Sequence, residues 1–181
     1  LHLESVDLTS LSGLSFGSET VTHGIILQDL PYLQDNPEPN GVTTINGDVQ
    51  VLRVPLSHLD FLSDVTTISG SLVLDGNPNL TTMAGLQSLN FLGQSLLLQN
   101  NAMLDSLQDL NSLTSIPGDL VIQANPTLNN IDALDQLTNV QGYVIISDTA
   151  LLNLVGIQNL ETVGQSFTLS NNPALTDTSD L

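Results

Sequence analysis

Seven glycines recur at nearly even intervals along this chain of 181 residues. The spacings between them are 23, 23, 23, 25, 24 and 22 residues. A self-similar period of this length is typical of stacked-repeat architectures, in which each unit buries its apolar face against its neighbours. We therefore expect a single solenoid domain over residues 1–181, with about seven coils. The glycines that mark the period are Gly24, Gly47, Gly70, Gly93, Gly118, Gly142 and Gly164.

Each glycine is followed by an alternating apolar run, which predicts a short strand with one buried face. After Gly118, for example, Leu120 and Ile122 alternate with outward residues. Strands that lie one coil apart run in the same direction, so they are expected to form one continuous parallel sheet. The other expected inward pairs are Val49/Val51, Leu72/Leu74, Leu96/Leu98, Val144/Ile146 and Phe167/Leu169, with Ile25/Leu27 and a partial pair, Leu1/Leu3.

Between one strand and the next glycine, apolar residues recur at every third position. A strict period of three fits neither a long α-helix nor a strand, and it predicts short extended pieces with single turns of 3-10 helix. Asp132–Leu137 is the best candidate for such a turn. The sequence thus predicts a right-handed parallel β-helix or leucine-rich-repeat-like solenoid, mostly β, with coils of about 23–24 residues. Residues 45–181 are expected to be regular, residues 1–44 irregular, and both ends uncapped.

Asparagine recurs three residues after the second inward position of the strand. A buried turn leaves backbone groups without partners, and an amide side chain can both donate and accept hydrogen bonds. Stacked asparagines are therefore expected to form a structural ladder, which the coils that follow Gly47 and Gly142 lack. The repeating glycine is expected where φ is positive or where two backbones approach closely. The ladder residues are Asn77, Asn101, Asn125 and Asn172.

The charge balance is extreme. The chain contains 19 acidic residues and one basic residue, Arg53, which gives a net charge of −18. A chain without a cationic surface cannot neutralise phosphates, which excludes nucleic acid and anionic membranes as partners. No apolar run is long enough for membrane insertion. Self-repulsion that keeps the protein soluble is one interpretation of the charge. A high-salt extracellular setting, or divalent cations that bridge carboxylates between molecules, is the other.

No pattern in the chain predicts catalysis, a metal site or a cofactor. The pairs Asp105/Asp109 and Asp132/Asp135 have the residue types of acid–base couples, but a solvated acidic face accounts for them better. No nucleophile elbow, phosphate loop or calcium loop occurs. The histidines lie in different coils, without the spacing of metal ligands: they are His2, His23 and His58.

A stripe of outward apolar residues is the candidate contact surface. The central outward position of four consecutive strands is apolar, and Tyr143 lies among the polar residues beside it. An exposed apolar stripe with a polar rim is typical of a contact surface. The alternative is that such residues simply favour strands. The stripe consists of Val73, Leu97, Val121 and Ile145.

Two further features lie outside the regular coil. The Pro- and Asn-rich segment Asp29–Gly41 is expected to protrude as a loop, which is either functional or a tolerated surface insertion. Asn79-Leu80-Thr81 matches the acceptor pattern for N-glycosylation.

The phrase Gly-x-Leu-x-Leu-x-x-Asn-Pro-x-Leu, followed by leucines at every third position, resembles the L-domain repeats of receptor ectodomains, a branch of the leucine-rich-repeat superfamily. The phrase is found at Gly70–Leu92, Gly118–Val140 and Gly164–Leu175, and the resemblance covers roughly residues 45–181. It implies an extracellular or cell-surface module that binds a protein or glycan partner, without catalysis. The alternative is a structural element that assembles with itself end to end through its open sheet edges.

Overall fold

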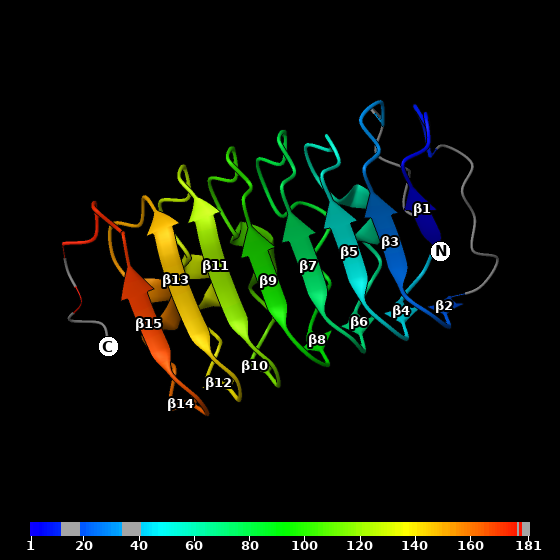
Figure 1. Ribbon diagram of the computed structural model, residues 1–181. Coiled ribbons are helices and arrows are strands. Elements are labelled where there is room, and N and C mark those ends of the chain that lie inside the picture. Colours follow the sequence, from blue (N-terminus) through cyan, green and yellow to red (C-terminus); the bar gives the residue numbers. More distant parts are fainter. Residues whose placement is uncertain (12–18, 34–40, 177, 179–181) are drawn as a thin grey trace.

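The computed structural model describes residues 1–11, 19–33, 41–176 and 178, and it confirms the predicted parallel β-solenoid (Figure 1). The chain rises through the long sheet at the front, returns behind it, and advances toward the left of the view with each coil. This sense of winding is right-handed, as is usual for parallel strands joined by a crossover. Nearly all of the regular structure is strand, interrupted by short 3-10 turns.

The front wall is an eight-stranded parallel sheet that receives one strand from each coil. Its register is continuous: Leu96 of one strand pairs with Leu120 of the next, and Leu120 with Val144. The predicted alternation is confirmed, because the inner strands bury every second residue. The strands are β1 (His2–Glu4), β3 (Ile25–Gln28), β5 (Val49–Leu52), β7 (Leu72–Asp75), β9 (Leu96–Gln99), β11 (Leu120–Asn125), β13 (Val144–Thr149) and β15 (Phe167–Ser170).

A second wall consists of two-residue strands. Its described part divides into a four-stranded and a three-stranded sheet, between β8 and β10. In the other coils the residue after the strand donates its N–H to the preceding coil, as Gln141 does to Ile116 at 3.0 Å. Pro117 holds this place after β10 and has no N–H to donate, which removes one of the hydrogen bonds that would join β10 to β8. The strands are β2 (Thr20–Val21), β4 (Thr44–Ile45), β6 (Thr67–Ile68), β8 (Phe91–Leu92), β10 (Ser115–Ile116), β12 (Asn139–Val140) and β14 (Thr162–Val163).

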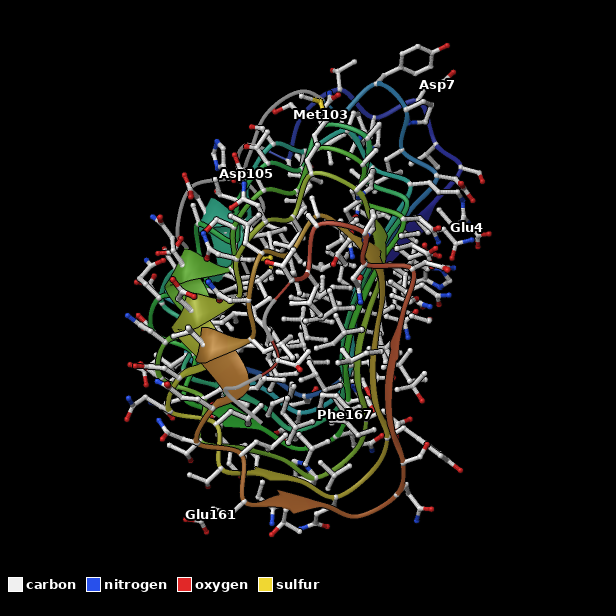
Figure 2. All side chains as sticks on the ribbon, turned by 90° about the vertical axis from the view of Figure 1, so that its left-hand side faces the viewer. Glu4, Asp7, Met103, Asp105, Glu161 and Phe167 are labelled. Carbon is white, nitrogen blue, oxygen red and sulfur yellow. The ribbon has the colours of Figure 1, made fainter. Side chains whose placement is uncertain are left out.

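The wall opposite the long sheet carries single turns of 3-10 helix, stacked one above another (Figure 2). The turn predicted at Asp132–Leu137 is present as Asp132–Leu134, and it begins without a side-chain cap. The four turns described are η1 (Asp60–Leu62), η2 (Gln108–Leu110), η3 (Asp132–Leu134) and η4 (Val155–Ile157).

The core lies between these walls as one continuous apolar column. The residues of the three-residue period point into it, and those of the inner coils, such as Leu104, Leu107 and Leu110, are fully buried. Burial decreases at β15, where Phe167 and Leu169 are only partly buried.

The seven glycines lie at three different places in the coil, so the prediction of a single repeating position is wrong. Four precede their strand by two residues, and Gln94 and Gln165 fill that place in two other coils. None of the seven has a positive φ, whereas close approach is correct: a Cβ on Gly47 would lie 2.6 Å from the backbone nitrogen of Gly24. The four are Gly47, Gly70, Gly118 and Gly142.

The left-handed backbone conformation occurs instead once per described coil, directly after the long strand or, in the two six-residue strands β11 and β13, at the next-to-last residue. Gly76 has φ 68° there, and Asn100 has φ 56°. Glycine and asparagine tolerate this conformation best, yet Arg53 and Ala124 adopt it as well. This position lies immediately before the position of the asparagine ladder, and it turns the chain into the core. The other members are Ser5, Asp29, Asp148 and Asn171.

The predicted loop Asp29–Gly41 falls largely outside the described residues, which omit 34–40. At its margins, Leu30 and Leu33 are fully buried, and the N–H of Gly41 donates to Asp64 Oδ2 at 3.0 Å.

Candidate functional site

The predicted stripe forms one straight column on the outer face of the long sheet. Val73 pairs with Leu97, Leu97 with Val121, and Val121 with Ile145. Adjacent strands lie about 4.8 Å apart, so these side chains stand next to one another. All four are half buried, because each is covered on two sides by its neighbours in the column. Gln50 precedes the stripe in the column and Thr168 follows it, so the continuous apolar run covers β7–β13, and Ile26 of β3 lies beyond Gln50 as a separate apolar residue.

Tyr143 stands beside the stripe, as predicted, and 45% of the residue is exposed. It directly precedes β13, and its backbone N–H donates to Asp119 Oδ1 at 2.8 Å. The ring and the Asp119 carboxylate therefore belong to one column at the same edge of the face.

This edge carries a ladder that the sequence reading missed. In four consecutive coils, from β5 to β11, the side chain just before the strand accepts a hydrogen bond from the backbone N–H of the residue before the next strand. Ser71 N–H donates to Asp48 Oδ1 at 2.8 Å, and Asp119 N–H donates to Ser95 Oγ at 2.9 Å. Between them, Ser95 N–H donates to Ser71 Oγ at the longer distance of 3.3 Å. The signal in the sequence was a short oxygen-bearing side chain directly before the first inward residue.

The ladder explains where glycine is required. A Cβ on Gly70 would collide with Asp48 Oδ1, and a Cβ on Gly142 would collide with Asp119 Oδ1. Glutamine replaces glycine only at Gln94, which follows the longer Ser71 bond, and at Gln165, which follows Tyr143.

The opposite edge of the face is rich in carboxylates and amides. Asn100 Nδ2 donates to Asp75 Oδ1 at 2.7 Å, and Asn171 Nδ2 donates to Asp148 Oδ1 at 3.1 Å. Ser147 is 3% exposed, and its Oγ has no hydrogen-bond partner among the described residues.

The single cation is also on this edge. Arg53 Nε donates to Asp29 Oδ1 at 2.6 Å and Nη2 donates to Asp29 Oδ2 at 2.9 Å. This pairing holds the pKa of Asp29 below the ordinary value of an aspartate and raises the pKa of Arg53. The positive charge of Arg53 is thereby engaged in an ion pair within the chain, at the end of β5.

The asparagines predicted as a ladder lie at the top of the coil and bond to the coil before them. Asn101 is fully buried; its Nδ2 donates to the carbonyl of Leu74 at 3.0 Å, and its Oδ1 accepts the N–H of Asn77 at 3.1 Å. Asn77, Asn125 and Asn172 make equivalent donations to the preceding coil. Val54 and Thr149 take the place in the two coils that were predicted to lack asparagine. Strands β11 and β13 extend to six residues at this place.

The remaining candidates do not gather into a site. Asn79 is exposed on the turn edge, where its Nδ2 donates to the carbonyl of Pro55 at 3.1 Å. Asp105 projects from the wall opposite the sheet (Figure 2). Asp109 lies within η2 and Asp132 begins η3 on that same wall. Among the described residues, no three His, Asp or Glu side chains are grouped as metal ligands would be.

An open polar groove of about 410 Å³ lies on the side away from the long sheet, between the last two coils. Asp135, Gln158 and Glu161 line part of it. None of the helices in the described ranges has the length and apolarity to span a bilayer.

The chain matches no protein-family model, and neither a curated protein nor a solved structure matches it.

Proposed function

We propose that this protein is a non-catalytic extracellular binding or adhesion module that presents the face of its long sheet to a protein or glycan partner. The observation that carries the proposal is the continuous aliphatic column over β7–β13, which lies between two polar edges. A planar, hydrogen-bonded sheet holds such a surface rigid before a partner arrives, so little ordering is needed on binding. The resemblance to receptor L domains supports an extracellular setting.

The wall opposite the sheet supports the same choice of face. It carries acidic residues such as Asp105 and Asp132, but the exposed large apolar residues described on the molecule do not form a comparable column there. The stripe is thus the surface on which apolar contact and polar specificity combine.

The test uses the 181-residue chain as a probe on protein and glycan arrays. Val121→Glu places a charge in the middle of the stripe and is expected to weaken binding at least about tenfold, because a buried unpaired carboxylate is costly. Ser115→Glu adds the same charge to the exposed short-strand wall, and it should leave binding unchanged. Array binding that survives Val121→Glu would show that another surface is used.

Self-assembly is the second candidate, and the partial burial of Phe167 and Leu169 in β15 favours it. A second copy whose β1 continued the parallel register would cover these side chains and pair the edge of β15 that has no partner strand among the described residues. Sedimentation and negative-stain microscopy test this candidate. Filaments that lengthen with concentration would support it, and a monomer at all concentrations would exclude it.

A further inference from the structure

We infer that the partner of the long-sheet face is a basic polypeptide segment in which Lys or Arg side chains alternate with apolar ones. This inference rests on the proposed binding function and names the class of partner. The segment is expected to dock over β11 and β13, where apolar, aromatic and acidic groups come together.

The apolar part of this subsite is the pair Val121 and Ile145, which are adjacent in the register and half buried. An incoming apolar side chain would cover the area that remains exposed. A divalent cation or a small polyamine offers no apolar side chain for this purpose, whereas a polypeptide does.

Carboxylates rim the pair on both sides, and each is fixed in place by a hydrogen bond to one oxygen. Asp119 Oδ1 accepts the N–H of Tyr143 at 2.8 Å, and Asp148 Oδ1 accepts Asn171 Nδ2 at 3.1 Å. The second oxygen of each carboxylate is therefore oriented before a cation arrives. Charge-assisted hydrogen bonds to such groups are stronger than neutral ones.

The chain itself supplies no cation to this rim. Arg53 is engaged by both carboxylate oxygens of Asp29 at the end of β5, three strands away from β11 in the sheet. At about 4.8 Å per strand this is roughly 14 Å, which is beyond direct contact. With a net charge of −18, the molecule attracts cationic partners over long range at low salt.

One further group suits a cationic chain. The exposed ring of Tyr143 lies in the column of Asp119, so a Lys or Arg side chain there would meet both a carboxylate and an aromatic face.

The experiment measures fluorescence anisotropy of labelled eight-residue peptides with the 181-residue chain. The probe alternates Lys and Val; one control peptide replaces Lys by Glu, and another replaces Val by Ser. The Lys/Val peptide is expected to bind most tightly. Its affinity should fall as salt rises from 0.02 to 0.3 M, since the ionic contacts are exposed.

Matched double variants locate the site. Asp119→Asn/Asp148→Asn should weaken the Lys/Val peptide about fivefold, as expected for the loss of two exposed ionic contacts. Asparagine retains the Oδ1 acceptor, so the hydrogen bonds from Tyr143 and Asn171 can persist, and thermal melting checks that the variant is folded. Asp105→Asn/Asp132→Asn removes the same charge from the opposite wall and should change the affinity less than twofold.

The outcomes separate this inference from the proposed function. Equal weakening by both double variants would mean that the peptide is held by overall charge alone, and it would overturn the basic-segment docking site. If the Lys/Val peptide does not bind while an uncharged glycan or protein binds and is lost in Val121→Glu, the partner class is wrong and the binding function stands. Absence of all binding to the sheet face would overturn both.

Discussion

A ladder residue and the glycine of the next coil depend on each other at the edge of the long sheet. Asp119 Oδ1 occupies the space where a Cβ on residue 142 would lie, and the carbonyl carbon of Gly118 would be 2.7 Å from that Cβ. The glycine is thus required by the side chain and the backbone of the neighbouring coil and not by its own backbone angles.

Gly142→Ala is therefore expected to destabilise the fold by about 2 kcal/mol, because the added methyl group displaces Asp119 from its hydrogen bond with the N–H of Tyr143. Gln94→Ala, at the same place in another coil, should be nearly neutral, since a Cβ is already present there. Denaturant unfolding of Gly142→Ala with and without Asp119→Ala measures the coupling. Purely additive effects in the double variant would contradict the dependence.

The buried asparagines satisfy backbone groups that no water reaches. Asn101→Ala removes the partner of the Leu74 carbonyl and of the Asn77 N–H, so we expect a loss of about 2–5 kcal/mol. Urea unfolding measures this loss. The exposed Asn90 provides the control, since Asn90→Ala should change the unfolding free energy by less than about 0.5 kcal/mol. A similar loss of unfolding free energy in both variants would argue against a stabilising role of the asparagine ladder.

The ion pair of Asp29 and Arg53 gives one surface contact a defined pH dependence. Because the hydrogen bonds from Arg53 lower the pKa of Asp29 in the folded state, the pair stabilises the fold above the ordinary pKa of an aspartate. That contribution is lost as the pH falls through the lowered value. The difference in melting temperature between the native chain and Asp29→Asn should thus be constant near neutral pH and shrink as the pH falls below the ordinary pKa of an aspartate. A difference that stays constant through this range would exclude the ion pair as its cause.

At the scale of elements, Pro117 lies where the short-strand wall divides. Pro117→Ser restores an N–H opposite the carbonyl of Leu92, as Gln141 has opposite Ile116. We expect the new amide to exchange hydrogen as slowly as that of Gln141. The unfolding free energy should change by less than about 1 kcal/mol, since a gained hydrogen bond offsets the added freedom of the unfolded chain. Fast exchange at residue 117 would mean that β8 and β10 are separated for another reason.

The elements also show what the sequence could reveal. The inward pairs were predictable because alternation allows only one face to be buried, as at Leu96 and Leu98. The recurring glycines suggested a false alignment of the coils. The hydrogen-bonded register decides which residues are equivalent, and this register aligns Gly70 with Gln94.

Two repeating columns, the left-handed position and the ladder at the edge of the sheet, could not be predicted from the sequence for a related reason. The left-handed position holds residues as different as Arg53 and Ala124, because the surrounding coils impose the conformation and overrule local preference. The ladder at the edge of the sheet mixes aspartate with serine, which in sequence resembles an ordinary polar turn. The stripe, by contrast, could be located from Val73 to Ile145 once the alternation was known, although its partner could not.

At the scale of the whole molecule, net charge is the property that we expect to affect stability most. With 19 acidic residues and one cation, the folded state concentrates negative charge that the unfolded chain spreads out. Raising NaCl from 0.01 to 0.5 M shortens the Debye length severalfold, so we expect the melting temperature to rise by about 3 °C or more. At pH 3, where most carboxylates are protonated, the same salt step should have little effect. An equal rise at both pH values would point to a salt effect unrelated to charge.

The asparagine ladder has a direction, and that direction matters for a chain made from its N-terminus. Each amide completes the turn of the coil before it, as Asn125 does for the carbonyl of Leu98 at 2.9 Å. A coil leaving the ribosome therefore remains unfinished until the next 23 or 24 residues have followed. For a chain that folds as it is synthesised, the last coil made is therefore incomplete, and a pause in translation is expected to expose that one turn instead of a whole unfolded domain.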